Sequence, residues 1–340
     1  MKICLIGEFG HKLDEGMKNT AAHYFTELDK KEHVIKLDVH DINKIHFWRS
    51  IRMFKPNIIH YIPGPTLTSF IMVKLISTLF PNAKIVMSAM NPSFNISFAK
   101  IIQITKPDRI LVQSTQTGLM FEKMGIPTEI LHSGVNLDQF RPIDREQKHK
   151  LREKFGIKLD EFVVLHIGPV KKNRNMDTFV NLQKAGYQVL IVASESVGIE
   201  KDVLDDLKSA GCIIYDKYIK NIEVVYALSD CYVFAAEYKR TNSGKKVSSG
   251  IEIPLTVLEA MATDMPVICT EYGGLSEIFR FDNVKRGLYF VDSESEIKTI
   301  LSDLKMHDSA TTTNRELVKD FSWDCIADNL ISIYGDLLRE

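Results

Sequence analysis

The chain has 340 residues, of which 45% are hydrophobic and 26% are charged. These proportions are typical of soluble globular proteins and exclude a disordered chain, a collagen and a coiled coil, while the length suits two domains of about 150–170 residues each. Lys and Arg number 43 against 44 Asp and Glu, which gives a net charge of −1. The chain therefore lacks the overall basic surplus of a nucleic-acid-binding protein.

Cysteine usage and the first residues point to a cytoplasmic protein. The five cysteines are odd in number, and no two of them have the spacing Cys-x-x-Cys. Most lie in apolar runs, where a thiol behaves as a small hydrophobe, so we expect reduced thiols rather than a metal site or a disulfide framework. The chain begins on a strand-like run without a signal peptide, and no window reaches the ~18–20 apolar residues of a membrane span.

Apolar runs of strand length alternate with stretches of helix length along the whole chain. Strands are expected at residues 2–7, 33–40, 57–63, 84–90, 109–114, 128–132, 162–168, 187–193, 212–216, 230–236, 266–270 and 287–292. Runs such as 110–112 and 163–165 are apolar at consecutive positions, as in parallel strands that are covered on both faces. Alternating strands and helices predict βαβ units and hence an α/β protein with doubly wound sheets.

A charged stretch, residues 141–161, separates the two sets of strands and is interpreted as a linker. Within it we expect a short helix over 147–155 that ends at Gly156. A last helix over 322–339, with Ser322 as N-cap, repeats apolar residues at helical spacing and should pack on another element. Two open sheets of this kind leave a cleft at the carboxyl ends of their strands, where ligands bind.

The most informative stretch is residues 248–274, which reads SSGIEIPLTVLEAMATDMPVICTEYGG. A proline suits the first turn of a helix, and such a start leaves the N–H groups of Leu255 and Thr256 without intrahelical partners. These groups attract an anion, a phosphate above all. Glu259 lies one turn further along, where it could face a polar ligand, and Glu252 precedes the helix. The plain alternative is that both acids are ordinary helix-terminal or solvated residues.

This stretch resembles the signature of the retaining GT-B glycosyltransferases of family 4, the glycosyl transferases group 1. The family pattern is a Glu, seven residues, a second Glu, Ala-Met-Ala, a Pro-Val strand and a Gly-Gly turn. Further stretches follow the order of the family, namely 107–114, 132–140, and Phe321-Ser322-Trp323 with Tyr334. The resemblance covers nearly the whole chain.

The resemblance implies a fold of two Rossmann-like, doubly wound parallel-sheet domains that face a cleft. Residues 1–145 would form the N-terminal acceptor-binding domain, and residues 160–320 the C-terminal domain that binds the nucleotide-sugar donor. Residues 321–340 would form a helix that crosses back to the N-terminal domain. The family is known for moving sugars, so the implied activity is that of a hexosyltransferase-like enzyme.

Carried over residue by residue, the resemblance assigns donor contacts to three residues. Glu259 matches the Glu that holds the ribose hydroxyls, because two carboxylate oxygens can accept from two neighbouring hydroxyl groups. Leu255 and Thr256 match backbone amides near the diphosphate. Gly16 and Met17 resemble the loop of the first domain that faces acceptor and sugar, although Gly16 is equally consistent with an ordinary loop glycine.

Two departures from the family concern residues near the transferred sugar. The position of the family's leading Glu is occupied by Ile251. Either the loop shifts by one residue, so that Glu252 reaches the sugar as a catalytic residue, or this contact is lost. We favour the shift of the loop. A family His falls on Met90, and the adjacent Asn91 either bonds a sugar hydroxyl or only precedes a turn. His60, on an apolar strand, is interpreted as a packed histidine rather than a catalyst.

A third departure concerns the cations that neutralise the diphosphate. The family Arg falls on Pro169, and the family Lys falls on Arg174. Lys171, Lys172 and Arg174 nevertheless supply three cations within four residues, which suits a leaving group that gains negative charge as the glycosidic bond breaks. The plain alternative is a solvated basic turn.

The implied reaction is transfer with retention, with no cofactor other than the nucleotide-diphosphate sugar as co-substrate and no metal held by an Asp-x-Asp motif. A helix dipole together with Lys and Arg would stabilise the departing diphosphate, and closure of the domains would exclude water. The sequence also shows no His, Cys, Asp and Glu cluster with metal-ligand spacing.

Residues 46–56 bear on the acceptor. They contain Arg49, Arg52 and Lys55 and no acid, together with the apolar residues Phe47, Trp48, Ile51 and Phe54. A basic amphipathic helix of this composition can lie on an anionic membrane surface, whereas the plain alternative is a surface helix that buries Ile51 and its neighbours. A lipid-linked acceptor, with the protein peripheral at the inner face of the membrane, is therefore a hypothesis.

The leading interpretation is a glycosyltransferase of cell-surface glycan biosynthesis that uses a hydroxyl acceptor, either a glycan or a lipid-linked sugar. Two alternatives share the architecture: a nucleotide-sugar epimerase, and a catalytically silent module that binds a sugar nucleotide or a partner. Ile251, Pro169 and Met90 favour the silent module, since each replaces a polar family residue. A nicotinamide dehydrogenase is disfavoured because residues 7–10, Gly-Glu-Phe-Gly, do not form G-x-G-x-x-G.

Overall fold

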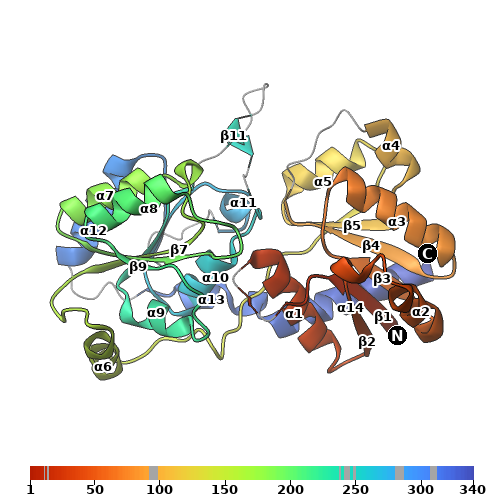
Figure 1. Cartoon of the computed structure of the whole chain (residues 1–340), viewed down its shortest axis with the longest axis horizontal. Coiled ribbons are helices and arrows are strands. Elements are labelled where there is room, and N and C mark those ends of the chain that lie inside the picture. The colour runs from red at the N-terminus through yellow and green to blue at the C-terminus, as the bar shows by residue number, and fades with distance from the viewer. Residues whose placement is uncertain are drawn as a thin grey trace. The chain divides into compact units, whose positions relative to one another are not determined.

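The computed structural model describes residues 1–10, 12–13, 15–91, 99–236, 239–240, 246–247, 250–279, 287–306 and 312–340. The chain divides into two compact units (Figure 1). The first unit contains residues 1–134, 239–253 and 323–340, and the second contains residues 135–238 and 254–322. The described residues of the range 239–253 are thus grouped with the first unit.

The first unit is built on a six-stranded parallel sheet of order β2-β1-β3-β4-β5-β6. Its strands are β1 (Lys2–Gly7), β2 (His33–Asp38), β3 (Ile58–Tyr61), β4 (Lys84–Ala89), β5 (Arg109–Val112) and β6 (Thr128–Ile130). The inner strands are short and mostly apolar because helices cover both faces, whereas the edge strands β2 and β6 carry polar residues. The strand order reverses between β1 and β3, which is the mark of a doubly wound sheet.

Helices form a layer on each face of this sheet. They are α1 (Gly16–Leu28), α2 (Ile45–Phe54), α3 (Leu67–Leu79), α4 (Ala99–Ile104), α5 (Thr115–Glu122) and α14 (Trp323–Arg339), with a 3-10 turn η1 (Val39–Asp41). Ile51 of α2, Val73 of α3 and Phe121 of α5 share one buried cluster with Ile6 of β1. The helices α1 and α14, from opposite ends of the chain, lie side by side (Figure 1).

The second unit repeats the plan with a parallel sheet of order β14-β13-β10-β7-β8-β9. Its strands are β7 (Val163–Gly168), β8 (Gln188–Ala193), β9 (Ile213–Tyr215), β10 (Cys231–Phe234), β13 (Val267–Thr270) and β14 (Leu288–Val291). Its helices are α6 (Arg145–Phe155), α7 (Met176–Lys184), α8 (Lys201–Ser209), α9 (Glu223–Leu228), α10 (Leu255–Ala262), α11 (Leu275–Phe279), α12 (Glu294–Met306) and α13 (Asn314–Leu317), with 3-10 turns η3 (Lys172–Arg174) and η5 (Lys319–Phe321).

All twelve expected strands are present, and their ends differ from the expected ones by at most two residues. The expected linker helix is α6, which begins after the cap residue Asp144 and ends at Gly156, where φ is 68°. A positive φ of this kind suits glycine at a helix end. The short antiparallel pair of β11 (Lys239–Arg240) and β12 (Lys246–Val247) was not expected from the sequence.

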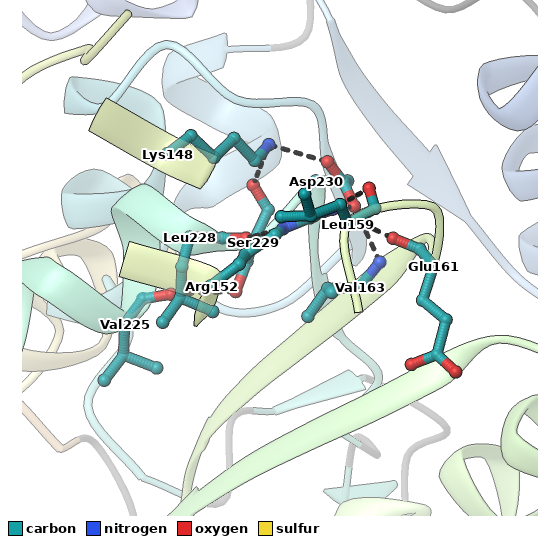
Figure 2. Close-up of polar contacts among 9 residues, drawn as sticks. All are labelled: Lys148, Arg152, Leu159, Glu161, Val163, Val225, Leu228, Ser229 and Asp230. Atoms are coloured by element: carbon teal, nitrogen blue, oxygen red, sulfur yellow. Dashed lines mark hydrogen bonds and ion pairs between the residues drawn. The ribbon is translucent and has the colours of Figure 1, made fainter. Parts of the chain in front are cut away.

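The linker helix is anchored by a buried ion pair rather than being a solvated connection (Figure 2). Arg152 is 4% exposed, and its Nη2 donates to Oδ2 of Asp230 at 2.5 Å. Lys148 donates to Oδ1 of the same carboxylate at 2.6 Å, and the backbone N–H of Val163 donates to Oδ2 at 2.7 Å. These bonds fix α6 against the start of β7 and the turn that leads into β10.

Candidate functional site

In the second unit the candidate site begins at the N-terminus of α10. Pro254 precedes the helix, and no side chain that the structure describes caps this end. The first backbone N–H groups of the helix, those of Leu255 and Thr256, have no intrahelical acceptor for the same geometric reason as in any α-helix. The helix start therefore offers donors to an anion, as the sequence predicts.

Glu259 lies on α10 with its side chain buried, and a tyrosine holds its carboxylate. The hydroxyl of Tyr226, on α9, donates to Oε2 of Glu259 at 2.6 Å. Burial raises the pKa of Glu259 to about 7, while the hydrogen bond from Tyr226 acts in the opposite direction. The carboxyl group therefore titrates near neutral pH, because the carboxylate has lost water but has gained one strong donor.

A second tyrosine connects the start of α10 to the central strands. The hydroxyl of Tyr232, on β10, lies 2.7 Å from Oγ1 of Thr256 and 3.3 Å from the carbonyl oxygen of Ile167. Because this bond engages the Thr256 hydroxyl, the backbone N–H is the group that Thr256 keeps for a ligand. The carboxyl end of β7 and the N-terminus of α10 are thus held together through one phenol.

The predicted cations follow β7, at and beside the 3-10 turn η3. Lys172 is exposed, and its ammonium pairs with Asp202 at 2.6 Å, which raises the pKa of Lys172. Lys171 and Arg174 are partly exposed, and neither forms an ion pair with any residue in the described ranges. Two of the three cations are therefore left for an anionic ligand, and the third is shared with α8.

The positive charge of Arg174 affects the pKa of His166, which lies on β7. Its Nδ1 lies 3.1 Å from the carbonyl oxygen of Val233, so the neutral ring carries its proton on Nδ1. Burial lowers the pKa of His166 to about 4; the Val233 bond opposes this, and the charge of Arg174 contributes to the lowering. Arg174 is therefore close enough to the end of β7 for its charge to affect the pKa of His166.

Glu252 is fixed in the first unit, where sequence analysis did not foresee its partners. Its Oε1 accepts hydrogen bonds from the hydroxyls of Ser114 at 2.7 Å and Thr117 at 2.9 Å. Its backbone N–H donates to the carbonyl oxygen of Met90 at 3.0 Å. The side chain is 5% exposed. These contacts attach the segment before α10 to the carboxyl ends of β4 and β5.

The other acceptor-side residues lie in the same unit. Gly16 is the first residue of α1 and Met17 the second, and a Cβ added to Gly16 would collide with the side chain of Ile251. A larger residue at position 16 would therefore require the side chain of Ile251 to move. Asn91 follows Met90 directly beyond the end of β4 and is partly exposed.

His60 is a packed histidine, as the sequence favoured. Its Nδ1 lies 2.7 Å from the hydroxyl of Tyr334 on α14, and its Nε2 lies 2.7 Å from the hydroxyl of Ser88. Burial lowers the pKa of His60 to about 3, so the ring is neutral at physiological pH. Among the residues described, no group of three or more His, Cys, Asp and Glu side chains could hold a metal ion.

Sequence reasoning missed Tyr226, Tyr232, Ser114 and Thr117. The tyrosines lie in apolar runs that are typical of a buried helix and a buried strand, so nothing in their surroundings marks a polar role. Ser114 and Thr117 did carry a signal, because they follow a buried parallel strand at its carboxyl end.

Residues 161–304 match the family described as Glycosyl transferases group 1. An uncharacterized glycosyltransferase of Methanocaldococcus jannaschii is 21% identical over 91% of this chain and 78% of its own length. The alpha-monoglucosyldiacylglycerol synthase of Acholeplasma laidlawii is 26% identical over 62% of this chain, which spans about half (52%) of that relative. The structure of HepE from Anabaena in complex with UDP-glucose superposes with a TM-score of 0.74 at 14% identity, covering 99% of this chain and 100% of HepE.

The two parallel sheets and these matches define the class: the chain has the GT-B fold of glycosyltransferases, and glycosyltransferase activity is supported. Within that class, residues 161–304 resemble the glycosyl transferases group 1, and a glycolipid synthase is among the relatives that the chain resembles. No helix in the described part of the chain is both long and apolar enough to cross a membrane.

Proposed function

We propose that the protein transfers a sugar from a nucleotide-diphosphate sugar to a hydroxyl acceptor with retention of configuration. The observation that carries the proposal is the uncapped N-terminus of α10, one turn from the buried carboxylate of Glu259. Backbone donors suit a diphosphate, and a carboxylate suits the hydroxyls of a ribose. Their spacing along one helix suits the two ends of a nucleoside diphosphate.

The second unit binds the donor in this proposal. Glu259 accepts hydrogen bonds from the ribose, while the N–H groups of Leu255 and Thr256 bind diphosphate oxygens. Arg174 and Lys171 add positive charge from the η3 turn, and Lys172 contributes less because Asp202 already pairs with it. As the bond between the sugar and the diphosphate breaks, these groups stabilise the charge that develops on the leaving oxygen.

The acceptor-side residues belong to the first unit. Glu252 and Asn91 contact the transferred sugar, and Gly16 with Met17 lines the acceptor side at the start of α1. The two hydroxyls that donate to Glu252 hold its carboxylate in one orientation. The acceptor oxygen bonds to the anomeric carbon, the bond from that carbon to the diphosphate breaks, and the acceptor proton passes to the departing diphosphate. This route needs no bound metal, and it is equally open to a glycan or a lipid-linked acceptor.

A lipid-linked acceptor is the finer proposal, and helix α2 is its main support. The helix buries Phe47 and Ile51 but leaves Ile45 86% exposed and Met53 70% exposed. Arg49 and Arg52 are exposed and form no ion pair with any described residue. Large apolar side chains beside free cations suit the surface of an anionic membrane. The relative from Acholeplasma is named as a synthase of a glycolipid, which agrees with this acceptor class.

The decisive assay incubates the protein with a panel of nucleotide sugars and simple acceptors and measures release of the nucleoside diphosphate. Acceptor-dependent release supports transfer, acceptor-independent epimerisation supports the epimerase, and binding without turnover supports the silent module. Retention is checked by the anomeric configuration of the product. Glu259→Ala should weaken donor binding, and an unchanged nucleotide affinity would count against the site.

Membrane contact is tested separately with sedimented vesicles that contain anionic lipid at low salt. The double variant Arg49→Glu with Arg52→Glu should lose binding that the wild type shows. A charge-matched control replaces Lys217 and Lys220 by Glu, both exposed in the second unit. Failure of the wild type to bind these vesicles would remove the membrane part of the proposal and leave the transferase part intact.

A further inference from the structure

We propose that Tyr226 is a positioning residue for the donor: its hydroxyl holds the Glu259 carboxylate in one orientation and directs Oε1 toward a ribose hydroxyl. The inference rests on the proposed function, since it assigns to Tyr226 a role at that donor site. Tyr226 would act through Glu259 and would not itself touch the ligand.

The first support is that the Tyr226 ring is itself immobilised. The side chain is fully buried on α9. It packs edge-on against Phe140, with ring centroids 5.4 Å apart, and lies 6.0 Å from the ring of Tyr232. A phenol confined in this way has few rotamers, so the position of its oxygen is set by the fold. The same hydroxyl lies 3.4 Å from the carbonyl oxygen of Thr256, on the turn of α10 that precedes Glu259.

The second support is that the other polar groups packed around α10 are directed elsewhere. Tyr232, from β10, directs its hydroxyl to Thr256 and Ile167. Arg315, from α13, donates through Nη1 to the carbonyl oxygen of Ala262 at 2.6 Å, and the other bonds of its guanidinium also go to backbone carbonyls. In the described part of the chain, Tyr226 is therefore the side chain that donates to Glu259.

The bond also decides which protonation state of Glu259 prevails. A buried carboxylate with no donor would take up a proton well above its ordinary pKa, and a protonated carboxyl accepts hydroxyl donors poorly. Burial raises the pKa of Tyr226 well above its ordinary value, and the charge of Glu259 adds to this, so the phenol remains a donor. Tyr226 thus favours the ionised form of Glu259 that a ribose would need.

The test measures the affinity of UDP between pH 6 and pH 9 by calorimetry, with GDP or ADP in its place if the wild type binds one of these more tightly. Because the pKa of Glu259 is about 7, wild-type affinity should rise between pH 6 and pH 8. Tyr226→Phe keeps the ring and removes the donor, so the midpoint of this rise should move to higher pH. If the pKa rises by about one, the ionised fraction at pH 7 falls from about one half to about one tenth, and the affinity falls about fivefold.

Two further variants separate positioning from general damage. Tyr187→Phe removes the phenol of another buried tyrosine of this unit, one packed on Phe162, and should leave the pH midpoint unchanged. Glu259→Gln should bind weakly without this pH dependence, and Tyr226→Phe should add nothing to it, because an effect transmitted through Glu259 requires the carboxylate. Circular dichroism of each variant checks that the fold is kept.

The outcomes distinguish this inference from the proposed function. A wild type that binds none of the three nucleotides at any pH overturns the proposed donor site, and the role of Tyr226 with it. A wild type that binds with a midpoint near pH 7, beside a Tyr226→Phe variant of equal affinity and equal midpoint, overturns the role of Tyr226 alone. Additive losses in the double variant with Glu259→Gln would also overturn it, since the two residues would then act independently.

Discussion

Replacing Arg152 by Ala should destabilise the second unit by about 3–5 kcal/mol, the usual cost of removing one partner of a buried ion pair. Figure 2 shows why the loss is large. Besides its bond to Asp230, the guanidinium donates through Nε to the carbonyl oxygen of Leu228 at 2.9 Å. Through Nη1 it donates to the carbonyl oxygens of Leu159 and Glu161, at 3.1 Å and 3.0 Å.

The size of this destabilisation follows from the groups that Arg152→Ala leaves without a hydrogen-bond donor. Three backbone carbonyls lose a donor, at about 1 kcal/mol each, and Asp230 loses a charge-assisted bond of about 1.5–3 kcal/mol. These losses add up to about 4.5–6 kcal/mol. Because Lys148 and the backbone N–H of Val163 still bond to Asp230, whose side chain is 21% exposed, the expected net loss is smaller, about 3–5 kcal/mol. Lys would not replace Arg here, because an ammonium cannot direct donors to the segment before β7 and to the turn between α9 and β10 at once.

Urea unfolding followed by far-UV circular dichroism measures the effect, with Lys154→Ala on the exposed side of the same helix as control. With a slope of about 2 kcal/mol per molar urea, the midpoint should fall by about 1.5–2.5 M. The protein has two tryptophans, Trp48 and Trp323, and both lie in the first unit, so their fluorescence reports that unit separately. A midpoint for Arg152→Ala equal to that of Lys154→Ala would refute the reasoning.

Three further predictions follow from single contacts. Tyr334→Phe leaves Nδ1 of buried His60 without its partner, so the first unit should lose about 1–3 kcal/mol, measured by tryptophan fluorescence in urea; an unchanged midpoint contradicts this. Glu259→Gln should stabilise the second unit at pH 8 and not at pH 4. The pKa of Glu259 is about 7 in the folded state and 4.5 in the unfolded state, so the wild type loses up to about 3 kcal/mol of folding free energy as the pH rises from 4.5 to above 7. Equal gains for Glu259→Gln at both pH values in urea titrations would exclude this account. Arg174→Ala should slow turnover at saturating donor about 100-fold, and Lys172→Ala less, because Asp202 already holds Lys172; equal losses in turnover number would contradict the difference.

The sequence predicted the two sheets well because a parallel strand that is buried on both faces has a recognisable local sequence pattern. Runs such as Ile110–Val112 are apolar at every position, and the helices between them have lengths that fit a βαβ crossover. The end of α6 could also be predicted from the local sequence, since Gly156 ends the helix by its own backbone conformation. Features of this kind depend on neighbours in sequence and can be predicted from them.

Side-chain partners could not be predicted in the same way. Ser114 and Glu252 are 138 residues apart and Tyr226 and Glu259 are 33 apart, and each pair meets only because two separate elements pack together. The burial of Arg152 could not be predicted for the same reason, because this residue occurs among exposed charges on α6 and only the tertiary structure buries it. Composition indicates that a segment is charged, whereas the partner of each charge depends on the fold.

Glu252 and Glu259 are seven positions apart in the sequence, yet they belong to different units. The chain passes from the first unit to the second between Ile253 and Pro254. Glu252 is held by two hydroxyls of the first unit, and Glu259 by one phenol of the second. A change at either residue should therefore act on a different half of the proposed reaction. We expect Glu252→Ala to reduce turnover while UDP affinity stays within about twofold, and Glu259→Ala to reduce UDP affinity first, because only the second of these carboxylates lies on the helix whose N-terminus we propose to bind the diphosphate.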